Sequence, residues 1–124
     1  RKRGQFMQEA VPVGEGSMAA VLGLESDKII DICRTVEAEC GEAVQAVNFN
    51  CPGQVVIAGS VGAVDKALAA LKEAGAKRAV LLPVSAPFHS TLMQPASKRL
   101  AEVFETITFH DAKIPVVANV TATI

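Results

Sequence analysis

A chain of 124 residues is long enough for one domain, or for a small domain with pieces of another attached. Half of the residues are apolar and a fifth are charged, which is typical of a protein that forms a core. The net charge of -1 argues against a nucleic-acid partner. No apolar run approaches the roughly 20 residues of a membrane span, and no secretory signal follows the basic start, so we expect no membrane partner.

The chain first shows the pattern of a strand followed by a helix. The apolar run Met18–Leu24, bounded by glycine and a polar cluster, predicts a buried strand. Ser26 is expected to cap the next helix, because its hydroxyl can accept a hydrogen bond from the first turn. Gly41 predicts the end of this helix. The residues at the spacing of one buried helix face are Ile29, Cys33, Val36 and Cys40.

A second strand is predicted over residues 44–50. Within it, Val47 and Phe49 alternate with Asn48 and Asn50, which is the period of a half-buried strand. A turn with adjacent proline and glycine follows, and capping of this turn accounts for the two asparagines.

The next elements are a strand, a helix and a strand. The apolar run 55–58 predicts the third strand, and Ser60 is expected to cap the second helix. Gly75 lies just past the end of that helix, and residues 78–84 predict a fourth strand. The buried face of the helix is expected to consist of Val64, Leu68 and Leu71.

This order over residues 15–85 is strand, helix, strand, strand, helix, strand. Both crossovers have the length of a βαβ unit, and the central two strands can pair as a hairpin. We therefore predict an α+β fold, a ferredoxin-like βαββαβ domain with both helices on one face of the sheet.

The flanking residues have a different character. A further helix is predicted by apolar residues at helical spacing, which are Leu92, Ala96, Leu100 and Val103. Pro95 fits this helix only in its first turn. Residues 114–124 contain a predicted strand with no turn after it. We interpret the chain as a segment of a longer protein, with residues 86–124 in a second domain.

Three cysteines, Cys33, Cys40 and Cys51, form no Cys-x-x-Cys pair, and the histidines are not clustered. This spacing suits neither a disulfide framework nor a zinc site. We expect reduced cysteines that pack as small apolar residues in a cytoplasmic protein, and no metal.

The two histidines differ in their surroundings. His110 lies in a linker and is expected to be a solvated loop residue. His89 follows a strand directly, and loops at strand ends often carry catalytic side chains. Histidine exchanges its proton near neutral pH, so His89 is a candidate general base. Ser90 is not expected to be its nucleophile, because adjacent side chains in an extended loop point apart and no nucleophile elbow surrounds it.

Three stretches carry a family resemblance: Arg3-Gly-Gln-Phe-Met-Gln-Glu-Ala-Val-Pro12, Val47-Asn-Phe-Asn-Cys-Pro-Gly-Gln-Val-Val-Ile-Ala-Gly59, and Pro83-Val-Ser-Ala-Pro-Phe-His-Ser90 with Leu92-Met93 after it. Together they resemble the bacterial malonyl-CoA:acyl carrier protein transacylases of fatty-acid synthesis. The resemblance implies that residues 15–85 form a ferredoxin-like small subdomain. Residues 1–14 and 86–124 would then belong to a large, α/β-hydrolase-like acyltransferase subdomain.

The resemblance implies an enzyme that moves malonyl from malonyl-CoA to the phosphopantetheine thiol of acyl carrier protein. The transfer would proceed through a serine ester and would need no cofactor. The family's serine lies in a Gly-His-Ser-x-Gly elbow, which is absent from this sequence. We therefore expect the nucleophile to lie outside the chain, and the chain alone to be inactive.

The resemblance also assigns roles to individual residues. His89 matches the family's base, and Arg3 matches the arginine that grips the malonyl carboxylate. Phe88 matches a bulky neighbour that leaves little room for a 2-methyl group. Lys77 and Arg78 match a basic pair that docks the acidic carrier protein.

Two alternatives stay open. The acyltransferase domain of a polyketide synthase carries the same motifs. A non-enzymatic, ferredoxin-like ligand-sensing module accounts for residues 15–85, but not for Arg3 and His89 outside that unit. We favour the discrete enzyme, as a monomer with malonyl-CoA and acyl carrier protein as partners. The resemblance also implies that Asn48 and Asn50 face the active-site cleft, and their roles stay open.

Overall fold

The structure is a computed structural model that describes residues 1–123. In chain order its elements are α1 (Lys2–Ala10), β1 (Gly16–Leu22), α2 (Ser26–Cys40), β2 (Val44–Cys51), β3 (Gln54–Ser60), α3 (Val61–Glu73), β4 (Arg78–Leu81), the 3-10 helix η1 (Thr91–Met93) and α4 (Gln94–Glu105). Within the described residues, no helix has both the length and the apolar character needed to cross a membrane.

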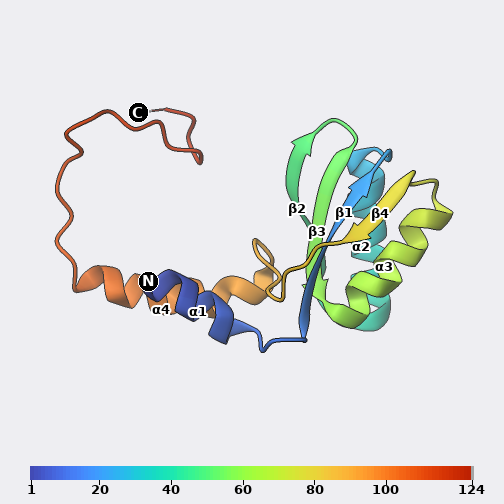
Figure 1. The fold of residues 1–124 in the computed structure, drawn as a ribbon, viewed down its shortest axis with the longest axis horizontal. Helices are drawn as coiled ribbons and strands as arrows, with labels where there is room; N and C mark the ends of the chain where they lie inside the picture. The colour runs from blue at the N-terminus through green and yellow to red at the C-terminus, as the bar shows by residue number, and fades with distance from the viewer. Residues whose placement is uncertain (124) are drawn as a thin grey trace.

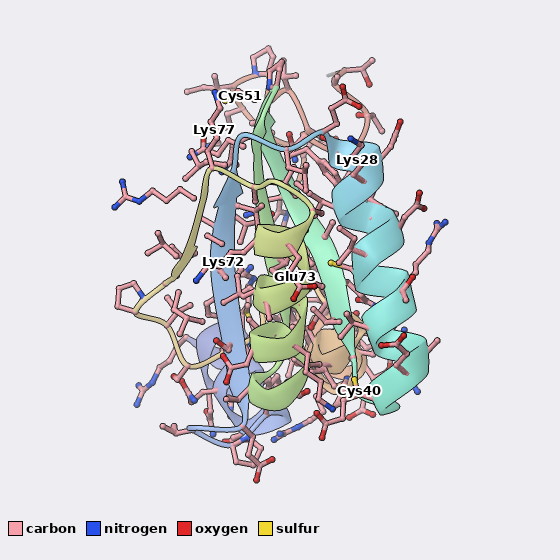
Figure 2. All side chains as sticks on the ribbon, turned by 90° about the vertical axis from the view of Figure 1, so that its right-hand side faces the viewer. Lys28, Cys40, Cys51, Lys72, Glu73 and Lys77 are labelled. Carbon is pink, nitrogen blue, oxygen red and sulfur yellow. The ribbon has the colours of Figure 1, made fainter. Side chains whose placement is uncertain are left out.

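The four strands form one antiparallel sheet in the order β2-β3-β1-β4, with α2 and α3 on the same face (Figures 1 and 2). Each of these helices connects two strands that have a third strand inserted between them. This is the split βαββαβ topology, so the predicted ferredoxin-like fold is confirmed. β4 ends at Leu81, three residues earlier than predicted, and Pro83 beyond it has no N–H to continue a ladder.

The main core lies between the sheet and the two helices. The predicted helix faces are confirmed, except that Cys40 is only partly buried. Complete burial of one leucine, isoleucine or valine side chain stabilises the fold by about 1.5–3 kcal/mol. The large side chains that are fully buried here include Ile29, Ile57, Leu71, Val21, Val44, Val55 and Val64.

Two of the predicted helix ends, at Ser60 and Gly41, are confirmed, whereas the predicted cap at Ser26 is not. The Ser60 hydroxyl accepts a hydrogen bond from the Ala63 N–H at 3.4 Å, so its predicted cap is confirmed. Gly41 ends α2 in the left-handed conformation, with φ 70°, as its lack of a Cβ permits. The predicted cap at Ser26 is wrong, because α2 already includes Ser26 and the residue before it occupies the capping position.

The predicted alternation in β2 is interrupted by a β-bulge. The pairing of β2 with β3 shifts register at Val47, where the strand holds an extra residue, and shifts again between Phe49 and Cys51. As a result, Val47 packs against the small cluster of Met18, Val56 and Ala58 on the face of the sheet that α2 and α3 leave open. Asn48 pairs with Val56 on that same face. Phe49 was expected to share a buried face with Val47, but it is 54% exposed.

α1 and α4 lie side by side beyond one end of the sheet (Figure 1). α4 and the position of Pro95 in its first turn were predicted, whereas α1 was not. Arg99 of α4 forms an ion pair with Glu9 of α1, and its guanidinium lies 4.1 Å from the ring centroid of buried Phe6. Hydrogen bonds from Gln5 and Arg99 lower the pKa of Glu9. These contacts hold the two helices together.

The strand predicted within residues 114–124 does not form in the part of the chain that the structure describes. Residues 106–123 run as an extended segment away from the sheet (Figure 1), with one isolated bridge between Ala118 and Thr123. Val120 is 95% exposed. A strand requires a neighbouring strand for its N–H and C=O groups, and none lies beside this segment.

Candidate active site

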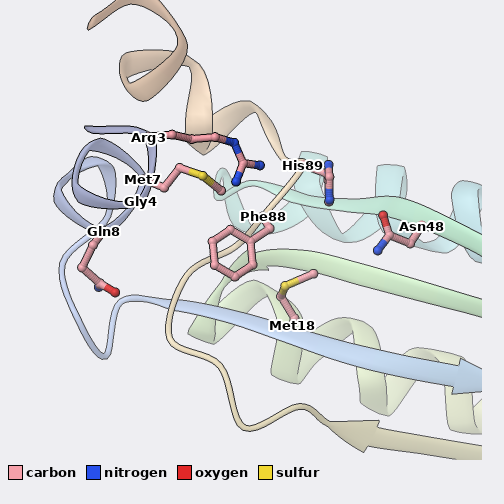
Figure 3. Close-up of a pocket in the computed structure, with 8 residues that line it drawn as sticks. All are labelled: Arg3, Gly4, Met7, Gln8, Met18, Asn48, Phe88 and His89. Atoms are coloured by element: carbon pink, nitrogen blue, oxygen red, sulfur yellow. The ribbon is translucent and has the colours of Figure 1, made fainter. Parts of the chain in front are cut away.

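A pocket of about 340 Å³ lies where α1, the open face of the sheet and the loop after β4 meet (Figure 3). Its lining residues come from distant parts of the sequence and are Arg3, Gly4, Met7, Gln8, Met18, Asn48, Phe88 and His89. Arg3, Phe88 and His89, which were singled out from the sequence, therefore meet in one pocket.

The loop that carries His89 is held by short-range hydrogen bonds. The Phe88 N–H donates to the Ala86 carbonyl at 3.0 Å. The buried Ser90 hydroxyl donates to the Pro87 carbonyl at 2.6 Å, and so is not available as a nucleophile in this conformation. Between them, His89 adopts a left-handed backbone conformation with φ 62°. Such a conformation is uncommon outside glycine and is often found at functional sites.

The start of this loop is packed against β1. Pro87 is fully buried, and a Cβ placed on Gly16 would lie only 2.4 Å from the Pro87 ring. Only glycine permits this approach, because the ring occupies the space of a side chain. The pair Gly16 and Pro87 therefore fixes the direction in which the chain enters the His89 turn.

The polar groups of the pocket have complementary chemistry. Arg3 extends from α1 toward the side of the pocket where His89 and Asn48 lie (Figure 3). Within residues 1–123, neither Arg3 nor His89 forms an ion pair. A guanidinium can bind a carboxylate through two hydrogen bonds, and an imidazole can take up a proton. The pocket can thus hold an anionic group beside a proton acceptor.

A second pocket of about 260 Å³ shares Arg3, Met7 and His89 with the first. Ser97 of α4 also lines it, but in the described part of the chain this hydroxyl makes no hydrogen bond to His89. Neither pocket contains a serine or cysteine that is hydrogen-bonded to the imidazole. The described residues also contain no group of three or more His, Cys, Asp or Glu side chains arranged to hold a metal.

The predicted basic pair lies away from these pockets. Arg78 pairs with Leu22 at the far end of β1, four residues from Met18, which lines the first pocket. At about 3.3 Å per residue, this separates Arg78 from the pocket by roughly 13 Å. Lys77 lies at the same end of the sheet as Cys51 (Figure 2). Both basic side chains are exposed.

The resemblance places both Asn48 and Asn50 in the active-site cleft, and other lining residues were not identified from the sequence. Asn48 enters the pocket because of the β-bulge, whereas Asn50 does not line it. Met7 and Gln8 lie on α1, which the sequence patterns did not predict. α1 has a weak apolar period and one buried residue, Phe6, so helical spacing offered little signal.

Known proteins are similar to this chain in sequence. No protein-family model matches the chain. Among curated proteins, it is 51% identical over 122 residues to the malonyl CoA-acyl carrier protein transacylase of Bacillus subtilis. It is 56% identical over 118 residues to the enzyme of that name from Escherichia coli. These alignments cover 98% and 95% of the chain but 38% of each relative, so the chain spans well under half of their length.

Solved structures of transacylases are similar to the structure of this chain. The chain matches a malonyl-transacylase in complex with a type II PKS acyl-carrier protein, with a TM-score of 0.90 and 51% identity. It matches the malonyl-CoA:acyl carrier protein transacylase of Xanthomonas oryzae with a TM-score of 0.90 and 47% identity. In both cases the match covers 98% of this chain, and 39% and 38% of the solved chains respectively.

Proposed function

We propose that this chain, which is homologous to a segment of the malonyl CoA-acyl carrier protein transacylases, is part of an enzyme that transfers malonyl from malonyl-CoA to acyl carrier protein. The observation that carries the proposal is the meeting of Arg3, Phe88 and His89 in one pocket. A ligand-sensing module that used only the ferredoxin-like unit would have no need of Arg3 or His89.

His89 is the general base of this proposal. It takes the proton of a serine hydroxyl as that oxygen attacks the thioester carbon, and the CoA thiol leaves with a proton. In the second half, His89 takes the proton of the phosphopantetheine thiol as its sulfur attacks the serine ester. The bond between the acyl carbon and the serine oxygen then breaks, and His89 returns the proton to that oxygen. The serine is supplied by a part of the protein outside residues 1–124, and we expect the 124-residue chain alone to show no transfer.

Arg3 binds the free carboxylate of the malonyl group. Two charge-assisted hydrogen bonds from a guanidinium match the two oxygens of a carboxylate. An acetyl group lacks the carboxylate and would leave the guanidinium unpaired, which disfavours acetyl-CoA.

Phe88 lines the same pocket, and its ring restricts the room for a 2-methyl group. A Phe88→Ala variant should therefore raise kcat/KM for methylmalonyl-CoA relative to malonyl-CoA.

Lys77 and Arg78 form a docking site for the acidic carrier protein. Both are exposed, and their position at the far end of the sheet suits contact with a protein surface more than with the malonyl group. Charges of this kind mainly raise the encounter rate. Replacing both with glutamine should raise KM for the carrier and weaken its dependence on salt, while kinetics with malonyl-CoA stay unchanged.

The remaining assignments follow from this chemistry. Acyl transfer between a thioester and a hydroxyl requires a nucleophile, a base and anion binding, so the enzyme needs no cofactor beyond its malonyl-CoA substrate. The domains divide into residues 1–14, 15–85 and 86–124, with the outer two belonging to the large subdomain. The enzyme acts in the cytoplasm, where reduced cysteines such as exposed Cys51 persist.

The identity of the carrier has a second candidate. The solved relative with a TM-score of 0.90 is in complex with a type II PKS acyl-carrier protein, so a carrier of polyketide synthesis is an alternative acceptor. Transfer rates to carriers from fatty-acid and polyketide synthesis, measured side by side with the complete enzyme, distinguish the two.

The test of the proposal is malonyl transfer by the enzyme that contains this segment, compared between wild type and His89→Ala. Removal of a general base should lower kcat by about a hundredfold or more. His110→Ala is the matched control, since His110 is exposed and lies outside both pockets. An active enzyme that His89→Ala leaves unchanged would overturn the assigned mechanism, and an enzyme without any transfer would overturn the function.

A further inference from the structure

We infer that Gln45 is a positioning residue that holds the His89 loop on the ferredoxin-like sheet. Gln45 lies on the edge strand β2, outside the pockets that contain His89. Its proposed role deepens the proposed function and rests on it, because the group that it positions is the candidate base.

The side-chain amide of Gln45 binds Thr91 through both of its ends. Its Oε1 accepts a hydrogen bond from the Thr91 N–H at 3.0 Å. Its Nε2 donates to Thr91 Oγ1 at 3.3 Å and to Glu37 Oε1 at 3.4 Å. Because both ends of the amide are engaged, its orientation is fixed. The contact joins α2 and β2 to a loop that lies 46 positions further along the chain.

The Thr91 N–H needs such a partner. It is the first amide of η1, which continues directly into α4, and the first amides of a helix have no acceptor within it. Ser90 occupies the capping position but makes no capping hydrogen bond, because its hydroxyl donates to the Pro87 carbonyl at 2.6 Å. Gln45 therefore supplies from a distant strand the acceptor that Ser90 does not provide.

This contact completes the restraint on His89. The left-handed conformation of His89 is strained and persists only where its surroundings impose it. On the N-terminal side, the hydrogen bond between Ser90 and Pro87 and the packing of Pro87 on Gly16 hold the turn. On the C-terminal side, the restraint comes from Gln45. Without it, the chain after His89 can rotate toward an extended conformation, which moves the imidazole away from Arg3.

The same geometry separates a positioning role from a purely structural one. The hydrogen bonds between Gln45 and Thr91 are exposed, so their loss removes little net stability. A displaced base, in contrast, lowers the rate at every turnover. The effect of removing Gln45 should therefore appear in kcat while the fold stays intact.

The experiment uses the enzyme that contains this segment, with the substitutions Gln45→Met and Gln54→Met. Methionine keeps the length of glutamine but cannot make these hydrogen bonds. Gln54 lies at the far end of the same hairpin and contacts Cys51 instead, so it is the matched control. We expect Gln45→Met to lower kcat about tenfold with KM for malonyl-CoA within about twofold, and Gln54→Met to match wild type.

The decisive measurement is the same substitution in a His89→Ala background. If Gln45 acts through His89, Gln45→Met should cause no further loss there. An equal loss in both backgrounds, or no loss in the wild-type background, would overturn the inference. If His89→Ala itself has no effect on an active enzyme, the role of His89 as the base fails instead. An enzyme without any malonyl transfer would overturn the proposed function, so the failures are distinguishable.

A second variant tests the same contact from the side of Thr91, so the inference can be tested even if Gln45→Met does not fold. Thr91→Pro removes the N–H and the hydroxyl that Gln45 binds, at the first position of a helix, where proline is tolerated. The extended backbone of Ser90, with φ −86° and ψ 167°, is compatible with a following proline. This variant should show the same loss of kcat as Gln45→Met. A wild-type rate for a folded Thr91→Pro enzyme would contradict the inference.

Discussion

At the scale of single residues, the candidate site depends on what each side chain can bind. The guanidinium of Arg3 is planar and has hydrogen-bond donors in fixed directions, whereas the ammonium group of a lysine is a single point charge. The polar side chains of His89 and Asn48, which line the same pocket, can form the remaining hydrogen bonds of a bound acyl group. The identity of the cation at residue 3 should therefore matter as well as its charge.

Replacing Arg3 with lysine tests this point in the complete enzyme. We expect kcat/KM for malonyl-CoA to fall by about 10- to 100-fold, because the paired hydrogen bonds to the carboxylate are lost. The activity with acetyl-CoA should change much less, so the preference for malonyl-CoA shrinks. Arg1→Lys is the control, since Arg1 lines neither pocket with His89. Equal losses with both substrates would contradict the assigned contact.

At the scale of elements, the helix starts show that a serine stabilises a helix only from the correct position. Ser60 precedes α3, and its hydroxyl accepts from Ala63 N and donates to Glu42 Oε2 at 2.8 Å. Ser26 lies inside the first turn of α2 and makes no capping hydrogen bond. The two serines thus form a matched pair with different surroundings.

We predict that Ser60→Ala lowers the free energy of unfolding by about 1 kcal/mol, because a capping hydrogen bond is lost. Ser26→Ala should change it by less than about 0.5 kcal/mol, since alanine favours a helical position. Urea denaturation of the two variants and the wild type measures the difference. A larger effect at Ser26 than at Ser60 would refute this account of the helix starts.

At the scale of the whole molecule, the ferredoxin-like core and the flanking segments have different degrees of burial. The core between the sheet and the two helices is closed, and it contains Cys33 at 2% exposure. Burial, with the nearby Glu37 carboxylate, raises the pKa of the Cys33 thiol to about 11 from an ordinary value of 9.0. In contrast, the apolar side chains of residues 106–123 are exposed, including Val116 and Val120.

This raised pKa makes the stability of the core depend on pH. Between pH 9 and 11, the unfolded chain releases the thiol proton more readily than the folded chain, so stability falls as pH rises. The contribution of Cys33 is fully present below about pH 9, and about 2 kcal/mol is lost by pH 11. Urea denaturation at pH 8 and pH 10.5 should show a smaller decline for Cys33→Val than for the wild type. Equal declines would exclude Cys33 as the cause.

The sequence alone determined the ferredoxin-like unit, because the spacing of apolar residues and the glycines at chain reversals are local signals. It also indicated His89, which follows a strand, whereas the interest in Arg3 and Phe88 came from resemblance. Only the tertiary structure decided that Arg3 and His89 line one pocket, that a β-bulge turns Asn48 toward it, and that Gln45 caps the helix after His89. Each of these depends on contacts between segments far apart in the chain, and such contacts leave no period in the sequence.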